Sequence, residues 1–550
     1  MLVSTSRRIN LRLSLATLSA CPAGGRLYSS YSKASRFNLR SIFRYTFVLA
    51  AGGSIGVWSA KTNSHTVDKS TTGISDLGTI RYATRSEFEN GLKELVLLLG
   101  EDGTSNLEHE LIAHSGTYWS TYRSNRNETP AVIVYPETTE HVSKIMQIAQ
   151  KYRIPVTPYS GGTSLEGNFT PTCGGISIDF KKMDRILNIH QGDLDAVVQP
   201  GLGWEDLNEE LAEHNLWFAP DPGPGAQIGG MIGTSCSGTN AVRYGTMKDN
   251  VLGLTVVLAD GTIIKTKQRP RKSSAGYNLT SMFIGSEGTL GIVTEATLKL
   301  VPKPQNESVC VATFNSLHAA AAAVQEIVKR GIQMGCVELL DEEMIRAINK
   351  AKSTNRIWSE EPSLFFKFHG TKAIVEDQIK SVKEVSQSHG SQSFYFAENE
   401  EECQLLWSAR KNALWSTIES APEGCVDVWT TDVCVPVSNL AEQIVRTQND
   451  LKENGIYGTI LGHVGDGNFH SIIMYDRTKE LEQVKALVHR MVAAALAVEG
   501  TCTGEHGVGI GKREFLADEL GQEAVDTMRK LKLALDPRLI LNPNKVVTLF

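Results

Sequence analysis

The chain has 550 residues, a net charge of −6 and a pI near 6.2. This net negative charge gives no sign of the basic surface that binds nucleic acid, so nucleic-acid-binding proteins are excluded. Nine cysteines are scattered singly without a C-x-x-C pair, which indicates reduced thiols rather than a disulfide framework. Beyond its N-terminal segment the chain is too long for one core, and we expect two or three domains.

The first 67 residues contain no Asp or Glu but many serines, arginines and lysines. This composition is typical of a mitochondrial transit peptide, although an ordinary basic tail has a similar one. Residues 41–60 form a mostly apolar run that is nearly long enough to span a bilayer, which requires roughly 20 apolar residues. Arg44 and several glycines weaken that run. We interpret 1–67 as a mitochondrial targeting segment, with an inner-membrane anchor or a sorting stop at 41–60.

The first organised block begins near residue 77 and alternates helices with short strands. Apolar spacing predicts a helix over 87–100, a strand over 131–135, a helix after residue 138 and a strand over 154–157. The last strand leads into residues 158–167, PYSGGTSLEG. These glycines do not follow G-x-G-x-x-G, and Pro171, Gly174 and Gly175 forbid a helix after them. Backbone amides in such a loop can still bind a pyrophosphate, but a glycine-rich turn without a ligand has the same pattern.

Three further glycine-rich stretches favour a nucleotide site over an empty turn. They are residues 220–224 (PDPGP), 228–245 and 285–294. Small residues at this density let the backbone approach a flat ring or a phosphate closely. Strands predicted at 251–258 and 262–266, joined by an Asp-Gly turn, place these glycines in an α+β domain.

Two motifs near the C-terminal end carry metal-binding residue types. Residues 462–470 read GHVGDGNFH and residues 503–509 read TGEHGVG. Two imidazoles and a carboxylate form a ligand set for a divalent metal with an open position, and a third histidine beside them is a potential base. His463 and His470 are seven residues apart, which would put them on opposite faces of one strand. Because Gly465 and Gly467 argue against a helix, we expect a turn that lets both rings converge.

The glycine motifs resemble the FAD-binding domain of the vanillyl-alcohol oxidase and p-cresol methylhydroxylase (PCMH) superfamily. The motif pair at 462–470 and 503–509 narrows the resemblance to its FAD-dependent D-2-hydroxyacid dehydrogenases, and most closely to the fungal-type mitochondrial D-lactate dehydrogenases. The resemblance covers roughly residues 80–550. It implies an α+β fold with a two-subdomain FAD-binding domain at 77–305, a cap domain for substrate and metal at 306–520, and a segment at 521–550 that returns to the FAD domain.

The resemblance also implies FAD as the cofactor. Some members bind the flavin covalently through a histidine, but the corresponding position here is Thr163, so we expect non-covalent FAD. The implied FAD-binding residues are mostly small or polar and come from the glycine-rich stretches and the C-terminal segment: Ser160, Gly161, Gly162, Thr163, Ser164, Gly223, Gly229, Ser235, Gly238, Asn240, Tyr244, Gly245, Gly291, Ile292, Val293 and Asn544.

The resemblance assigns a metal and a base to the two C-terminal motifs. His463, His470 and Glu505 would bind Zn²⁺ or Mn²⁺ and leave positions for substrate oxygens. The metal would lower the pKa of the α-hydroxyl, and His506 would remove its proton as general base. The α-hydrogen would then leave as a hydride to flavin N5, which yields a 2-oxo acid.

Two more residues are implied to bind the substrate carboxylate. Arg410, within residues 407–412 (WSARKN), matches the carboxylate-binding arginine of the family. A planar guanidinium suits the two oxygens of a carboxylate. Asn468 would add a hydrogen bond near the same carboxylate.

The implied substrate is a small monocarboxylate. Related D-2-hydroxyglutarate dehydrogenases place a lysine in the strand before a Val-Pro or Leu-Pro pair, where this chain has Thr430 and Thr431. A second buried carboxylate without a cation has a large desolvation cost. D-lactate is therefore expected, with D-2-hydroxyglutarate and glycolate as alternatives of the same family.

The chain has no C-x-x-C-H haem motif, so a reduced flavin would need an external acceptor. The targeting segment predicts an enzyme at the mitochondrial inner membrane, facing the intermembrane space, with cytochrome c as acceptor. The alternative from another class is a flavin-free mitochondrial zinc metalloprotein, which would keep the metal site but leave the upstream glycine motifs unexplained. The colour of the purified protein separates these hypotheses.

Overall fold

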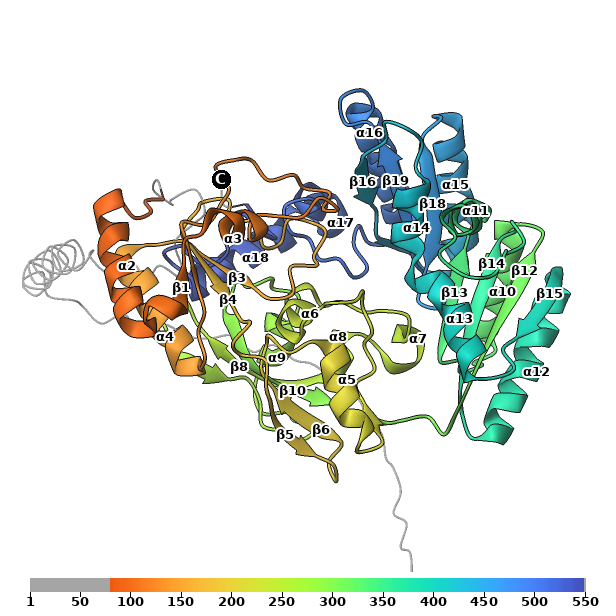
Figure 1. Cartoon of the computed structure of the whole chain (residues 1–550), viewed down its shortest axis with the longest axis horizontal. Coiled ribbons are helices and arrows are strands. Elements are labelled where there is room, and N and C mark those ends of the chain that lie inside the picture. Colours follow the sequence, from red (N-terminus) through yellow and green to blue (C-terminus); the bar gives the residue numbers. More distant parts are fainter. Residues whose placement is uncertain (1–79, 549–550) are drawn as a thin grey trace, which may run out of the picture. The chain divides into compact units, whose positions relative to one another are not determined.

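The computed structural model describes residues 80–548 (Figure 1). The predicted targeting segment at 1–67, with its apolar run at 41–60, lies outside the described residues. Among residues 80–548, no helix is both long enough and apolar enough to cross a membrane.

The first sheet has four strands in the order β1-β2-β4-β3. Its elements are α2 (Arg85–Leu99), η3 (Glu101–Gly103), β1 (Thr104–Ser105), α3 (Glu108–Ala113), β2 (Val132–Val134), α4 (Thr139–Tyr152), β3 (Val156–Tyr159) and β4 (Ile176–Asp179). Thr138 caps the start of helix α4, and its hydroxyl accepts the His141 backbone N–H. Its apolar stripe, which includes Val142 and Ile145, is buried under the sheet, as the predicted helix requires. No helix follows the glycine loop at 158–167, which confirms that prediction.

The second sheet has five strands in the order β5-β6-β10-β8-β9, all antiparallel. This region contains β5 (Ile186–His190), β6 (Asp195–Val198), α5 (Trp204–Ala212), β7 (Leu216–Trp217), α6 (Ile228–Thr234), α7 (Ala241–Tyr244), α8 (Met247–Asn250), β8 (Val251–Val257), β9 (Ile263–Lys265), α9 (Leu279–Phe283), β10 (Ile292–Lys299) and β11 (Val301–Pro302). The β8–β9 hairpin confirms the two predicted strands, and Gly261 takes the left-handed conformation at its turn (φ 86°). Helix α6 forms despite its glycines because Ile228, Met231 and Ile232 pack into the core of this region.

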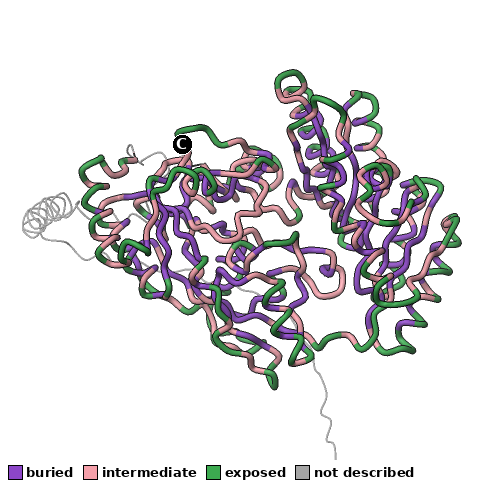
Figure 2. Tube along the Cα trace, viewed as in Figure 1, coloured by how far each residue is buried: buried purple, intermediate pink, exposed green. Residues whose placement is uncertain are grey.

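An eight-stranded antiparallel sheet follows, with the path β15-β12-β14-β13-β18-β19-β16 and β17 paired to β19. Its elements are β12 (Asn306–Phe314), α10 (Leu317–Lys329), β13 (Cys336–Leu340), α11 (Glu342–Ala351), β14 (Ser363–Gly370), α12 (Lys372–Ser388), β15 (Ser391–Phe396), α13 (Glu400–Lys411), α14 (Ala413–Ser420), β16 (Asp427–Thr430), β17 (Val433–Cys434), η4 (Val437–Asn439), α15 (Leu440–Glu453), β18 (Tyr457–Gly462), β19 (Asn468–Tyr475) and α16 (Leu481–Leu496). Its strands are mostly buried (Figure 2).

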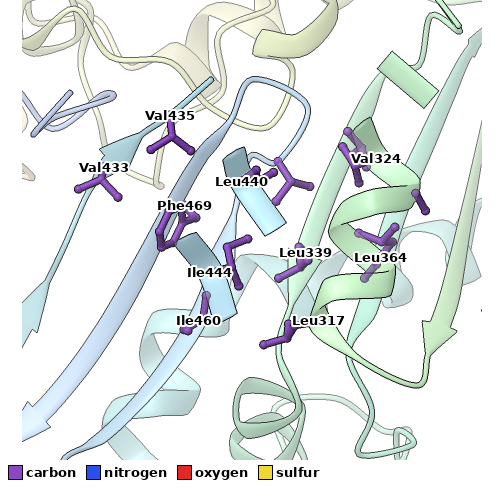
Figure 3. Packing of buried hydrophobic residues seen from close by; sticks show 14 of the residues in the cluster. Leu317, Val324, Leu339, Leu364, Val433, Val435, Leu440, Ile444, Ile460 and Phe469 are labelled. Atoms are coloured by element: carbon purple, nitrogen blue, oxygen red, sulfur yellow. The ribbon is translucent and has the colours of Figure 1, made fainter. Parts of the chain in front are cut away.

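The hydrophobic core of this large sheet holds its central strands in place. Leu339 of β13 and Ile460 of β18 pack with Leu317, Leu440 and Ile444 from helices α10 and α15 (Figure 3). Strands β13 and β18 therefore offer a rigid base for the side chains at their ends.

The last elements return to the first sheet. They are η5 (Arg513–Phe515), α17 (Leu516–Leu520) and α18 (Gln522–Leu535). After α18, Leu541 forms a parallel bridge to Val156 of β3. The buried Lys532 ammonium donates to the carbonyls of Thr289 (2.7 Å) and Leu541 (2.6 Å). The segment 521–548 thus packs against the glycine-rich region that precedes β12.

Candidate functional site

A cavity of about 660 Å³ extends between the glycine-rich stretches and the ends of β18 and β19. One end of its wall is mostly backbone and small side chains, and the other end carries histidines, a carboxylate and basic groups. Twelve of the expected FAD-binding residues lie on this wall: Ser160, Gly161, Gly162, Thr163, Ser164, Gly223, Gly229, Gly238, Asn240, Gly291, Ile292 and Val293.

The glycine end of the cavity is shaped to receive a large flat ligand. Among the described residues, a Cβ atom on Gly223 would meet no atom within 4 Å beyond its chain neighbours, so the missing side chain leaves open space at the cavity wall. At Gly161, by contrast, a Cβ would lie 2.5 Å from the carbonyl oxygen of Gly225, because two backbone segments meet there. Open space at one glycine and close backbone approach at another are what a bound dinucleotide requires. The residues present therefore fit FAD.

Four expected FAD-binding residues are not on the cavity wall. Ser235 ends helix α6 in the left-handed conformation (φ 56°), and Gly245 ends α7 (φ 78°). The Tyr244 hydroxyl hydrogen-bonds Nδ1 of His369 at 3.1 Å. The Asn544 amide donates to the Thr172 hydroxyl at 3.3 Å and ties the C-terminal segment to a loop.

The β18–β19 hairpin brings the two predicted metal ligands together. His463 directly follows β18 and His470 lies in β19, opposite Leu461 in the register. Their ring centroids are 5.5 Å apart, which confirms the predicted turn between them. Glu505 approaches from the loop after α16, and its Oε1 lies 3.0 Å from Nε2 of His463 and 3.3 Å from Nε2 of His470.

These distances fit a divalent metal. Ligand atoms at about 2.0–2.2 Å from a tetrahedral Zn²⁺ are separated by about 3.3 Å. The three ligand atoms of His463, His470 and Glu505 all lie within 4.8 Å of one another. Burial alone would raise the pKa of Glu505, but the two imidazoles lower it well below its usual range. The residues therefore present two imidazoles and an ionised carboxylate to one point.

Each ligand side chain is oriented by a further hydrogen bond. Nδ1 of His463 lies 2.7 Å from Oε1 of Glu338, and Nδ1 of His470 lies 3.0 Å from the carbonyl oxygen of Thr431. The oxygens of Glu338 and Thr431 accept these Nδ1–H groups, so Nε2 of each ring is turned toward Oε1 of Glu505, where the metal would lie. Oε2 of Glu505 accepts the Ser237 hydroxyl at 2.7 Å.

His506 lies beside the metal position with its ring stacked on His470, at a centroid distance of 5.1 Å. Its Nδ1 has no hydrogen-bond partner among residues 80–548 and lies 4.0 Å from both Glu166 and Asp432. Burial lowers the pKa of His506 to about 4. The imidazole is therefore neutral near pH 7 and can accept a proton.

The buried carboxylate of Asp432 anchors the loop that carries Glu505 and His506. Its Oδ2 accepts both of their backbone N–H groups, at 2.9 and 3.0 Å. The Lys512 ammonium lies 3.2 Å from the same oxygen and 3.4 Å from Oε1 of Glu166. Burial alone would raise the pKa of Asp432, but Lys512 and the neighbouring histidines lower it well below its usual range.

Of the two residues expected at the substrate carboxylate, the structure places one on the cavity wall and the other away from it. Arg410 lies on the cavity wall at the end of α13, and its Nε donates to Oε2 of Glu338 at 2.7 Å. Asn468 is buried away from the wall, where its amide donates to Oδ1 of Asp432 (2.8 Å) and to the carbonyl of Val433 (2.9 Å). Asn468 therefore supports the anchoring aspartate and does not face the cavity.

Several residues of this site were not indicated by the sequence motifs. Glu338 and Asp432 lie outside both C-terminal motifs, and the only signal was a carboxylate within a buried apolar strand or beside one. Lys367 and Lys411 also lie on the cavity wall. The Lys367 ammonium lies 4.3 Å from the centroid of the Trp407 ring. Lysines at strand or helix surfaces are too common to identify from sequence alone.

Comparisons with known proteins agree with this architecture. Residues 130–267 match the family model described as FAD binding domain, and residues 303–546 match FAD linked oxidases, C-terminal domain. The p-cresol methylhydroxylase structure superposes with a TM-score of 0.71 at 18% identity, over 86% of this chain and 99% of that chain. The fold is the PCMH type that the sequence predicted, with an FAD-binding domain followed by the C-terminal domain of FAD linked oxidases.

Two curated relatives identify the family within this fold. The mitochondrial D-lactate dehydrogenase [cytochrome] 1 of Saccharomyces cerevisiae is 50% identical over 83% of this chain and 79% of its own length. The mitochondrial D-lactate dehydrogenase [cytochrome] of Kluyveromyces lactis is 47% identical over 87% of this chain and 84% of its own length. The chain belongs to the D-lactate dehydrogenase (cytochrome) family of oxidoreductases, which confirms the family predicted from the motifs.

Proposed function

We propose that this protein oxidises D-lactate to pyruvate with FAD and passes the electrons to cytochrome c. The observation that carries the proposal is that one end of a glycine-walled cavity holds three converging metal ligands, a neutral histidine and an arginine. The names of the relatives support lactate as substrate and a cytochrome as acceptor.

When bound, FAD accepts the two electrons of the alcohol, and a divalent metal such as Zn²⁺ or Mn²⁺ lowers the pKa of the hydroxyl it contacts. His463, His470 and Glu505 would hold that metal. The Arg410 guanidinium, held by Glu338, binds the substrate carboxylate and so fixes which face of Cα is presented to the flavin. This selection predicts that L-lactate reacts poorly.

His506 takes the hydroxyl proton. Its neutral imidazole is available near pH 7, and the unpartnered Nδ1 leaves the ring free to carry the proton without breaking an existing hydrogen bond. Asp432 holds the backbone of His506 and thereby sets the position of the ring relative to the metal.

FAD is bound without a covalent link in this proposal, because Thr163 occupies the wall where some relatives carry a flavin-linked histidine. Acid precipitation of the protein should therefore release all of its flavin into solution. Flavin that stays with the precipitate contradicts this part of the proposal.

The proposal places the enzyme in the mitochondrion, as the names of both relatives do. The inner-membrane anchor at 41–60 remains a prediction on residues outside the described part. Fractionation of mitochondria that carry the full chain, compared with a chain lacking residues 41–60, tests it. Equal release of both chains by salt or alkali contradicts anchoring.

The decisive test is flavin reduction by single substrates under anaerobic conditions. D-lactate should bleach the flavin rapidly and L-lactate hardly at all, and the reduced enzyme should then reduce cytochrome c. The proposal fails if D-lactate does not reduce the flavin, or if the reduced enzyme does not react with cytochrome c.

A second candidate substrate is D-2-hydroxyglutarate. Thr430 lies on the cavity wall where the enzymes for this diacid place a lysine, but Lys411 lies on the same wall and could meet a second carboxylate. The ratio of kcat/KM for the two acids decides between them. If Lys411→Met lowers kcat/KM for the diacid only, and the diacid is the better wild-type substrate, the second candidate replaces the first.

A further inference from the structure

One buried carboxylate connects the metal ligand set to the arginine on the cavity wall. Oε1 of Glu338 lies 2.7 Å from Nδ1 of His463, and Oε2 accepts Nε–H of Arg410 at 2.7 Å. The Glu338 side chain is fully buried, while that of Arg410 is 13% exposed toward the cavity. Each oxygen therefore has its own donor, and both contacts are short.

The strand beneath Glu338 is rigidly placed. Strand β13 lies between β14 and β18 in the interior of the eight-stranded sheet, with Glu338 opposite Phe365 in the register. Its neighbour Leu339 pairs with Gly462, the residue before His463. Backbone pairing and the side-chain contact thus fix the position of His463 relative to the same strand.

We propose that Glu338 is a positioning residue that holds His463 and Arg410 as one unit. The proposal rests on the proposed function, in which His463 binds the metal and Arg410 binds the substrate carboxylate. A single carboxylate between them fixes the spacing of the two groups that recognise a hydroxyl and a carboxylate on adjacent carbon atoms. Because that carboxylate accepts Nδ1–H of His463, it also holds the ring with Nε2 directed at Glu505 and the metal position.

Stability alone does not account for this arrangement. Buried ion pairs are often no more stabilising than apolar residues of the same volume, because desolvation offsets their attraction. Leucine or valine at this position would suit the apolar pattern of β13, in which the remaining side chains are buried and uncharged. The carboxylate is explained by the two donors it holds.

Replacing Glu338 with glutamine should change the contacts in a specific way, because the amide has one acceptor oxygen and one donor NH₂ group. The guanidinium of Arg410 can only donate, so the amide oxygen of Glu338→Gln should face Arg410. Its NH₂ group then faces Nδ1 of His463, which must accept and so carries its proton on Nε2, where the metal should bind. We expect the affinity for Zn²⁺ to fall by about 10–100-fold, with a smaller change in KM at saturating Zn²⁺.

Asp341→Asn is the matched control. Asp341 follows the same strand three residues later, is also buried, and accepts the Met344 N–H at 2.8 Å without contacting His463 or Arg410. Both variants should load FAD. Zn²⁺ affinity is measured on the FAD-loaded resting enzyme by competition with a chromophoric chelator. The proposal is overturned if the Zn²⁺ affinity of Glu338→Gln lies within threefold of the control.

Glu338→Asp tests the connection between the two partners. It keeps the negative charge but withdraws the carboxylate by one methylene, too far to meet both donors. We expect weaker Zn²⁺ binding and a KM for D-lactate about tenfold higher, with kcat less affected. An unchanged KM for D-lactate overturns the part of the proposal in which Glu338 positions Arg410. If Glu338→Gln does not load FAD, Glu338→Asp takes its place in the Zn²⁺ measurement. A Zn²⁺ affinity of Glu338→Asp within threefold of the control then overturns the part of the proposal that concerns His463.

Failure of this inference can be told apart from failure of the proposed function. Zn²⁺ affinity is measured without substrate, so it reports on Glu338 even if D-lactate is not oxidised. Conversely, a wild-type enzyme that oxidises D-lactate alongside a Glu338→Gln variant with unchanged Zn²⁺ affinity retains the function and loses only the positioning role.

Discussion

The two ends of the cavity are built by opposite means. At the glycine end, the wall consists of backbone and small side chains, and space for the ligand comes from side chains that are absent, as at Gly223. At the charged end, space is filled by side chains that hold one another, with Glu338 and Asp432 each accepting from several donors. The first end recognises a large cofactor by shape. At the second end, hydrogen bonds fix the positions of the reactive groups.

This difference predicts how the two ends respond to mutation. A change at the charged end should stop chemistry while the cofactor stays bound, because the glycine wall is mostly backbone and small side chains, with Ser237 as a contact to Glu505. A change at the glycine end should weaken the cofactor while the metal ligands still converge. Variants that affect both ends equally would show that the ends are not independent.

The largest effect is expected for the metal ligands. His463→Ala or Glu505→Ala removes one of the three converging ligand atoms, so turnover should be abolished and bound metal lost, while FAD remains. Metal analysis, the visible flavin spectrum and steady-state rates measure these three quantities. His190→Ala is the control, because it breaks a histidine–carboxylate contact of 2.8 Å away from the cavity wall. Full activity in a metal-free His463→Ala variant would contradict the ligand assignment.

Removal of the base should have the next largest effect. His506→Asn keeps a polar side chain on the Asp432-anchored loop but cannot accept the proton at the same place, so flavin reduction by D-lactate should slow by about 10²–10⁴-fold. Single-turnover stopped-flow absorbance measures this step directly. Metal content should equal that of the wild type. A wild-type rate of flavin bleaching would assign the proton to another residue.

The glycine end can be tested by filling its space. Gly223→Leu places a Cβ where residues 80–548 have no atom within 4 Å beyond the chain neighbours, so the fold should tolerate it, but the side chain should exclude FAD. Overpacking of about 1–3 kcal/mol corresponds to roughly 10–100-fold weaker FAD binding. Gly192→Leu is the control, since Gly192 also has open space around it but is not on the cavity wall. Equal FAD affinity in both variants would show that the cofactor does not approach Gly223.

The same contrast explains what the sequence could reveal. Helix α4, the β8–β9 hairpin and the glycine stretches are local patterns, and each was predicted from a short run of residues. The convergence of His463 and His470 was also predictable, because a glycine turn separates them by only a few residues. Helix α6 was not, because its glycines argue against a helix and tertiary packing of Ile228 outweighs them.

The residues that the sequence did not indicate act over long separations. Glu338 meets a histidine 125 positions later, and Asp432 meets the backbone of Glu505 across 73 positions. No local spacing encodes such contacts. Asn468 shows the reverse case: it lies within a recognised motif and was assigned to the substrate, but its amide is used to hold Asp432 beneath the site.

A comparison of two buried carboxylates defines the role of cations at the charged end. Asp432 and Asp341 are both buried carboxylates, but only Asp432 has a lysine and histidines beside it, and its pKa is lowered. Burial without a cation raises the pKa of Asp341 from 3.8 to about 7, and two backbone contacts only partly oppose this. Between about pH 4 and 7 the folded state then holds a proton that the unfolded state releases.

Folding stability should therefore fall as pH rises through this window, by about 4 kcal/mol at most. Asp341→Asn keeps an acceptor for the Met344 N–H and removes the titration. The variant and the wild type should melt at similar temperatures near pH 4.5, and the variant should melt higher near pH 8, with excess FAD present throughout. A difference in melting temperature that is the same at both pH values would show that Asp341 is ionised in the folded protein even without a cation.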